Sequence, residues 1–261
     1  MSDTGPYRRV YVIGDIHGRS DLLDKMIARV EQDFERHPRL DGLTVTLGDY
    51  VDRGPDSRGV LDRLAKNPFP TRYTALKGNH EALFEAFLSD PAVASQWRRF
   101  GGLETLHSYG VSVAAVMVGK GFEEASAALR YAVPEEHFRF LGSLQLATSV
   151  GDYFLCHAGV RPGIPLERQS AEDLLWIRDE FLNSRTGFGK IIVHGHSPAA
   201  RNPAESDQYR HWGVRHGATD LPCPRTGKSP IYFSAVANRP VGLFVIGLGE
   251  AAAPSRMRGR N

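Results

Sequence analysis

Short apolar runs that each end in a glycine-bounded polar cluster constrain the fold of this sequence more than any other feature. The first run, residues 10–13, stops at the cluster 14–18, and apolar side chains then recur at helical spacing as far as Phe34. A second run, residues 43–47, stops at the cluster 48–54. A strand, a polar turn and a helix in repeated order predict a layered α/β architecture.

The same order recurs along the chain, with further strands expected at residues 72–76, 153–155 and 191–193. Additional helices are expected at residues 57–66, 82–88 and 174–182, the last preceded by a capping signature at Ser170 and Asp173. Residues 90–145 depart from this order, and their glycine pair and helical stretch indicate a helical insertion beside the site. Ligands of open α/β sheets bind at the carboxyl ends of strands, so the polar clusters mark the candidate site.

The side chains at these strand ends are typical ligands of hard or borderline divalent metals. They comprise two carboxylates, an amide and three imidazoles: Asp15, His17, Asp49, Asn79, His157 and His196. Such a set suits Mn²⁺, Fe²⁺ or Zn²⁺ and differs from a Cys-rich structural zinc site. Six ligands exceed what one tetrahedral ion needs when water must also bind, so two ions are expected. If Asp49 bridges, Asp15 and His17 complete one site, and the other three ligands complete the second.

Phosphoester hydrolysis is the chemistry that such a pair of ions favours. Two ions about 3.5–4 Å apart can share a hydroxide and stabilise the attacking and leaving oxygens of a phosphoryl displacement. His80 is expected to protonate the leaving oxygen, with Asp52 fixing its tautomer and raising its pKa. Arg53 and Arg178 carry planar guanidinium groups that match phosphate oxygens.

Composition gives no support to a membrane or nucleic-acid function. The chain has 261 residues, a formal net charge of +2 and two cysteines, too few for a disulfide framework. No apolar run approaches the roughly 20 residues of a membrane helix, and residues 1–9 are polar and contain no secretory signal. We therefore expect one cytoplasmic domain over residues 1–261 that binds neither membranes nor nucleic acids.

Three motifs resemble the signatures of the PPP family of serine/threonine protein phosphatases, within the calcineurin-like phosphoesterase superfamily. They read GDIHG, GDYVDRG and GNHE and lie at residues 14–18, 48–54 and 78–81. The resemblance spans residues 10–198, and its later motifs are similar to those of the bacterial and phage branch. In that branch the segment LLWIR, residues 174–178 here, carries a phosphate-binding arginine.

The resemblance implies a central β-sandwich flanked by helices and two metal ions, most often manganese. It also implies hydrolysis of phosphoserine and phosphothreonine and the roles given above to Asp52, Arg53 and His80. His194 is an alternative ligand to His196, and the resemblance favours His196. Two other functions stay open: hydrolysis of dinucleoside polyphosphates or other small phosphoesters, and a non-catalytic phosphate-binding module or poorly folding chain.

The chain departs from the family after about residue 200. Where the family continues with an IDTGA segment into its last core strands, residues 208–217 read QYRHWGVRHG. Reading the possible codons of residues 201–225 one nucleotide later permits a sequence very close to the missing segment, and the codons of Trp212 and Gly213 force its glycine. We hypothesise a shift of reading frame near residues 199–201; the alternative is an authentic, divergent tail.

This departure predicts a sandwich that lacks its closing strands. Residues 201–228 show neither an alternating nor a buried pattern, and several prolines would remove ladder donors: Pro203, Pro222, Pro224 and Pro230. We expect no well-packed core strands after about Ala200, despite the apolar run 243–248. Exposed apolar surface and aggregation would follow.

Overall fold

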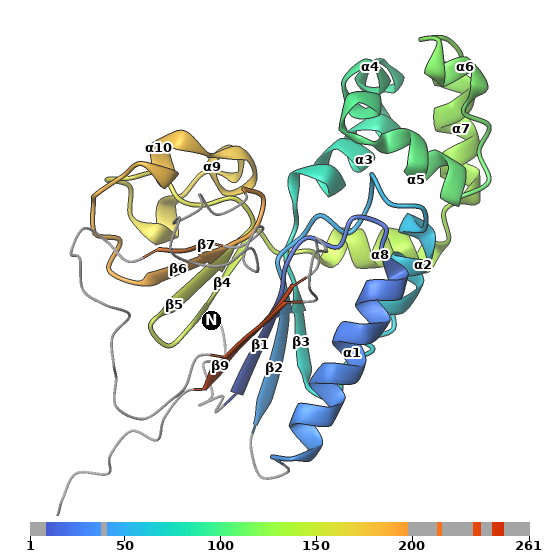
Figure 1. Cartoon of the computed structure of the whole chain (residues 1–261). Helices are drawn as coiled ribbons and strands as arrows, with labels where there is room; N and C mark the ends of the chain where they lie inside the picture. Colours follow the sequence, from blue (N-terminus) through green and yellow to red (C-terminus); the bar gives the residue numbers. More distant parts are fainter. Residues whose placement is uncertain (1–8, 38–40, 198–212, 216–231, 236–241, 248–261) are drawn as a thin grey trace, which may run out of the picture.

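Two β-sheets pack against each other, and helices cover their outer sides (Figure 1). The computed structural model describes residues 9–37, 41–197, 213–215, 232–235 and 242–247. The strands of the first sheet are, in spatial order, β3 (Arg72–Ala75), β2 (Gly42–Thr46), β1 (Arg9–Ile13), β9 (Gly242–Gly247) and β8 (Tyr232–Ala235). Those of the second are β4 (Ala147–Val150), β5 (Tyr153–Cys156), β6 (Ile191–His194) and β7 (Gly213–Arg215).

The helices form three groups (Figure 1). Beside the first sheet lie α1 (Ser20–Glu35), α2 (Ser57–Leu64) and α3 (Asn79–Ser89). The insertion follows as η1 (Pro91–Val93), α4 (Ala94–Trp97), η2 (Arg98–Phe100), α5 (Gly102–Ser108), α6 (Ala114–Met117), α7 (Phe122–Ala132) and α8 (Glu135–Ser143). Beside the second sheet lie η3 (Leu166–Arg168), α9 (Ala171–Trp176) and α10 (Asp179–Leu182). The expected sandwich with flanking helices and a helical insertion is confirmed.

Alternating side chains of β1 divide the core into two layers. Val10 and Val12 belong to the cluster between the sheets, together with Leu155 of β5. Tyr11 and Ile13 point the other way and belong to the cluster under the helices. All five side chains are fully buried, and full burial of an aliphatic side chain contributes roughly 1.5–3 kcal/mol. Period-two patterning therefore fixes which face of the first sheet meets the second.

Parallel pairing brings the polar turns together. β1, β2 and β3 are parallel neighbours, and β5 and β6 form a parallel pair in the second sheet. Parallel strands end at the same edge of a sheet, so the clusters that follow β1 and β2 lie side by side. Ile16 and His17 donate backbone hydrogen bonds to the carbonyl of Asp49, at 2.9 and 2.8 Å, which fixes one turn against the next.

The expected single helix over residues 174–182 is wrong, because non-helical residues separate α9 from α10. Ile177 is extended, with ψ of 141°, and Arg178 has φ of −133° and ψ of −95°. The Ser170 cap itself is as expected, since its hydroxyl accepts from the Asp173 N–H at 3.0 Å. β4 is a strand that sequence patterning did not predict.

Three strands after residue 200 pair with neighbouring strands, but the packing of their side chains lies outside what the structure describes, so the expectation of no well-packed core strands stays a prediction. β9 pairs antiparallel with β1, β8 pairs with β9, and β7 pairs with β6. The four prolines lie outside the described residues, so the expectation that they remove ladder donors is untested. Most of the tail lies outside the described residues, and the reading-frame hypothesis and the single domain stay predictions. None of the described helices is both long and apolar enough to cross a membrane.

Candidate metal centre

The backbone of the site is held in an unusual conformation. Five site residues have positive φ, a region that non-glycine residues rarely adopt: His17 (47°), Asp49 (54°), Asp52 (72°), Arg53 (67°) and His196 (60°). Each such residue costs on the order of 1–3 kcal/mol and persists only where surrounding contacts hold it. Every one of them lies in a turn that follows a strand, so the strain is concentrated where the polar side chains gather.

Glu81 supplies part of that support. Its buried carboxylate accepts the backbone N–H groups of Asp49 at 2.8 Å, Tyr50 at 2.7 Å and Gly78 at 2.9 Å. It therefore ties the turn after β2 to the start of α3. Burial raises the pKa of Glu81 to about 7, against these backbone donors, which lower it. The sequence analysis included Glu81 in a motif but gave it no role. The only signal for this role in the sequence was its place in the GNHE motif.

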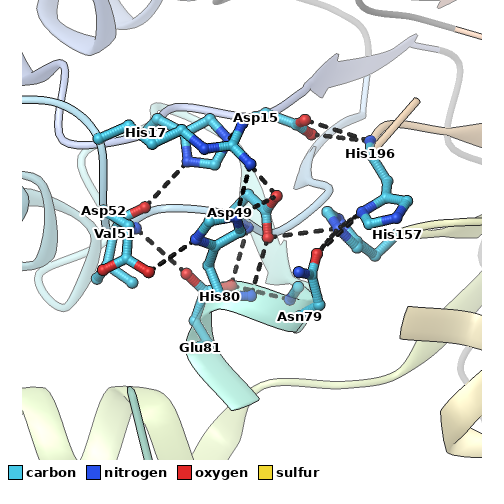
Figure 2. A network of polar contacts seen from close by, with 12 residues as sticks. Asp15, His17, Asp49, Val51, Asp52, Asn79, His80, Glu81, His157 and His196 are labelled. Carbon is cyan, nitrogen blue, oxygen red and sulfur yellow. Dashed lines mark hydrogen bonds and ion pairs between the residues drawn. The ribbon is translucent and has the colours of Figure 1, made fainter. Parts of the chain in front are cut away.

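Asp49 lies at the centre of the expected ligands (Figure 2). Its Oδ2 is 3.6 Å from His17 Nε2 and 3.8 Å from His80 Nε2. Its Oδ1 is 3.3 Å from His157 Nε2. The two carboxylate oxygens thus face different groups of imidazoles, which is the arrangement that a bridging ligand requires. Burial, reinforced by the neighbouring Asp15, raises the pKa of Asp49 well above its usual range.

The tautomers of two histidines direct lone pairs toward Asp49. His17 Nδ1 lies 3.0 Å from the Val51 carbonyl, and His157 Nδ1 lies 2.9 Å from the Leu47 carbonyl. A carbonyl only accepts, so each Nδ1 carries the hydrogen and each Nε2 presents its lone pair. A backbone carbonyl on the distal nitrogen is the usual support of a metal-binding histidine.

Asn79 and His196 complete the second group. Asn79 Oδ1 lies 3.0 Å from His157 Nε2 and 2.9 Å from His196 Nδ1. The His157 lone pair therefore faces both the amide oxygen of Asn79 and a carboxylate oxygen of Asp49. Converging lone pairs of this kind fit a cation. The residues present are thus compatible with a divalent metal.

Asp15 makes hydrogen bonds to the backbone of His196, a ligand expected at the other ion. Its carboxylate accepts the backbone N–H of His196, at 3.3 and 3.2 Å. Gly195 makes this approach possible, because a Cβ there would come within 2.3 Å of Asp15 Oδ1. The compact group around Asp49 Oδ2 contains His17 and His80, whose ligand atoms all lie within 4.8 Å of one another. The ligand role of Asp15 stays a prediction.

The imidazoles of the site are neutral, as metal ligands must be. Burial lowers the pKa of His17 to about 3 and that of His196 to about 2. Burial and then Arg53 lower the pKa of His80 to about 3, whereas sequence reasoning expected Asp52 to raise it. The expected hydrogen bond is present, with His80 Nδ1 2.7 Å from Asp52 Oδ2. Burial in turn raises the pKa of Asp52 to about 7.

The two expected phosphate-binding arginines contact opposite groups of the centre. The Arg53 guanidinium donates to the Nε2 atoms of His17 and His80, each at 3.0 Å. Arg178 Nε donates to His196 Nε2 at 3.0 Å, and the Arg178 side chain is otherwise largely exposed. Arg178 therefore lies at the site even though it is placed at a helix break.

The alternative ligand His194 points elsewhere. Its Nδ1 lies 3.0 Å from the Gly195 carbonyl, and its ring packs edge-on against Phe181, at 5.0 Å between centroids. His196 is the histidine that joins Asp49 and His157. Two residues of the insertion that sequence reasoning did not single out, Trp97 and Thr105, also reach the site through Asp52.

Comparisons with known proteins identify the family of the chain. Residues 8–221 match the calcineurin-like phosphoesterase family. Serine/threonine-protein phosphatase 2 of Escherichia coli is 41% identical over 97 residues, which are 37% of this chain and 39% of that protein. Serine/threonine-protein phosphatase 1 of Salmonella typhimurium is 29% identical over 204 residues, 75% of this chain and 81% of that protein.

A solved structure described as a putative diadenosine tetraphosphatase is 24% identical, with a TM-score of 0.43, and the match covers 66% of this chain and 60% of that one. The match of the family to most of the chain and the two bacterial relatives confirm the resemblance that the motifs indicated. The chain belongs to the calcineurin-like phosphoesterase family.

Proposed function

We propose that this protein is a metal-dependent phosphatase that hydrolyses phosphoserine and phosphothreonine in proteins. The observation that carries the proposal is the position of Asp49, whose two carboxylate oxygens face the unprotonated nitrogens of His17 and His157. The His80–Asp52 pair and two arginines lie against the same imidazoles. The two bacterial relatives are serine/threonine-protein phosphatases by name, which supports a protein substrate.

Two divalent ions would be held by the six residues expected from the sequence. One would take Asp15, His17 and Asp49, and the other Asp49, Asn79, His157 and His196. Manganese is our expectation, with iron or zinc as alternatives of the same ligand preference. When bound, the ions supply positive charge that neutralises phosphoryl oxygens and lowers the pKa of water.

The chain's own side chains would position the phosphate and the proton. Arg53 and Arg178 present N–H donors from opposite sides of the centre, and a phosphate dianion is a stronger acceptor than the imidazoles that they now contact. Transfer of Arg53 to phosphate would take a cation away from His80 Nε2. A proton on that nitrogen, balanced through Nδ1 by the Asp52 carboxylate, would then be available to the leaving oxygen.

Metal content and substrate preference test the proposal together. Purified full-length protein would be analysed for bound metal and assayed with a phosphoserine peptide, diadenosine tetraphosphate and p-nitrophenyl phosphate. We expect turnover of the peptide, its loss with EDTA and its recovery with Mn²⁺. Preference for diadenosine tetraphosphate would replace the proposal by the small-phosphoester alternative. Phosphate binding without turnover of any substrate would identify a non-catalytic module. A cytoplasmic location remains a prediction.

A further inference from the structure

The helical insertion reaches the centre through Asp52. Trp97 Nε1, from α4, donates to Asp52 Oδ2 at 2.8 Å, and Thr105 Oγ1, from α5, donates to Asp52 Oδ1 at 2.6 Å. All three residues are almost fully buried. Asp52 lies 45 positions from Trp97 and 53 from Thr105 in the sequence, so these contacts are tertiary. The insertion also holds the next residue, because the Arg53 N–H donates to the Gly101 carbonyl at 3.1 Å.

The direction of each hydrogen bond around Asp52 follows from the chemistry of the donors. An indole N–H can only donate. The Thr105 hydroxyl accepts the Asp52 backbone N–H at 2.9 Å and lies 2.9 Å from Ser57 Oγ, so its own hydrogen is directed to the carboxylate. Both oxygens of Asp52 therefore receive a hydrogen from the insertion.

These hydrogen bonds determine which ring nitrogen of His80 carries the hydrogen. Its Nδ1 lies 2.7 Å from Asp52 Oδ2, the same oxygen that accepts from Trp97. An oxygen that already accepts one N–H has a carboxylate lone pair free for a second, so His80 Nδ1 is the donor. The opposite nitrogen, Nε2, is then the atom that faces Asp49 and the substrate side.

We infer that Trp97 and Thr105 are positioning residues for phosphoester cleavage. They hold Asp52 so that His80 keeps its hydrogen on Nδ1, and Nε2 is then the nitrogen that takes up a proton from water and passes it to the leaving oxygen. The insertion is on this view part of the catalytic apparatus and not only a cover for the helical core. The inference rests on the proposed function, since His80 needs an oxygen leaving group on which to act. It extends that function by naming the element that sets the tautomer.

Matched variants separate this role from a structural one. Thr105→Val keeps the shape and removes the hydroxyl, Thr105→Ser restores the hydroxyl, and Trp97→Phe keeps a ring against Phe87 and removes the N–H. Ser126→Ala is the control, because Ser126 is a buried hydroxyl of the same insertion that bonds to the Phe87 carbonyl, away from Asp52. Thermal unfolding would be followed for all four variants. If Trp97→Phe does not fold, Thr105→Val alone tests the inference.

The kinetic readout is the dependence on the leaving group. We expect Thr105→Val and Trp97→Phe to lower kcat for a phosphoserine peptide by about 10- to 100-fold, the usual range for residues that support a site through another residue. KM and bound metal should stay unchanged, and p-nitrophenyl phosphate, whose leaving group needs little protonation, should lose less. Thr105→Ser and Ser126→Ala should resemble the wild type. Equal losses on both substrates, loss of metal, or a Thr105→Ser defect as large as that of Thr105→Val would overturn the inference.

A spectroscopic readout keeps the inference separate from the proposed function. The His80 side chain would be assigned in ¹H–¹⁵N spectra of the full-length protein by comparison with His80→Asn. We expect an Nδ1–H tautomer in the wild type and a mixture of tautomers in Thr105→Val. If the wild type hydrolyses no phosphopeptide, the proposed function fails, and this measurement still decides the tautomer. An unchanged Nδ1–H signal in both Thr105→Val and Trp97→Phe would refute the positioning role.

Discussion

The two groups of imidazoles on either side of Asp49 are built in different ways. On one side, His17 is fixed by the Val51 carbonyl and His80 by Asp52, which is itself held by the insertion. On the other side, the hydrogen bonds described for the His196 side chain go to Asn79, His157 and Arg178. These partners are themselves candidate ligands or phosphate-binding residues.

This contrast shows which part of the centre is preorganised. The group that contains His80, which would handle the proton, is set by hydrogen bonds outside the metal sites. In the other group His157 is fixed by the Leu47 carbonyl, but the side chain of His196 is held by residues that would contact the ions or the substrate. We therefore expect the first group to keep its geometry when ligands change, and the second to depend more strongly on them.

Substitution of the residue shared by both groups should have the largest effect. Asp49→Asn removes the charge that faces both sides and should abolish activity and lower bound metal, because a bridging carboxylate balances the charge of two ions. Metal analysis and p-nitrophenyl phosphate assays would check this. Asp24→Asn is a control, since Asp24 is a carboxylate paired with Arg63 and belongs to none of the candidate ligand groups among the described residues. Full metal content in Asp49→Asn would contradict the shared position.

Removal of His80 should affect chemistry and leave the metals in place. His80→Asn should lower kcat for alkyl phosphates by on the order of 10²–10⁴, the usual contribution of acid–base catalysis. The loss should shrink for an aryl phosphate. Bound metal would be measured on the same preparations. Because His80 lies 3.8 Å from Asp49 Oδ2, a parallel loss of metal would show that it serves as a ligand and not as an acid.

The two arginines offer a direct comparison of the groups. Arg53 contacts two imidazoles with two nitrogens, whereas Arg178 contacts one and is largely exposed. A hydrogen bond to a charged group contributes about 1.5–3 kcal/mol, so Arg53→Ala should raise the inhibition constant of inorganic phosphate by about 10- to 100-fold. Arg178→Ala should raise it less, because water screens its charge. Arg161→Ala, an exposed arginine paired with Asp173, should leave it unchanged. An equal or larger effect of Arg178→Ala would reverse the ranking.

Local patterning was sufficient to predict the strand ends and the candidate ligands that gather there. Residues such as Asp15 and Asn79 follow apolar runs directly, and parallel pairing then brings those ends together. Residue chemistry alone did not predict that Trp97 and Thr105 reach Asp52, because those contacts join positions about 50 residues apart. Long-range contacts of buried polar groups leave no periodic signal in the sequence.

The backbone conformation of two segments shows the same limit of prediction from local patterning. The helical pattern of residues 174–182 is continuous, yet the chain breaks at Arg178, which then contacts His196. Residues 201–228 lack a strand pattern, yet β7 pairs with β6, because backbone ladders need a partner edge more than a particular side-chain sequence. In each case the backbone conformation departs from what the segment's own pattern indicates.

Acid titration of the metal-free protein would test whether the folded structure keeps the imidazoles of both groups equally rigid and buried. His17 and His196 have folded-state pKa values of about 3 and about 2, below the ordinary value near 6.5. As the pH falls below about 6.5 the unfolded chain binds protons that the folded chain does not, so stability declines with falling pH, by about 2 kcal/mol per histidine at pH 5. The free energy of unfolding, measured with denaturant at several pH values, should therefore fall less steeply with falling pH in both His17→Asn and His196→Asn. If only His17→Asn changes the slope, His196 takes up its proton by local opening, and the second group is the less rigid one. If neither variant changes it, both imidazoles are accessible to protons in the folded protein, contrary to the burial described here.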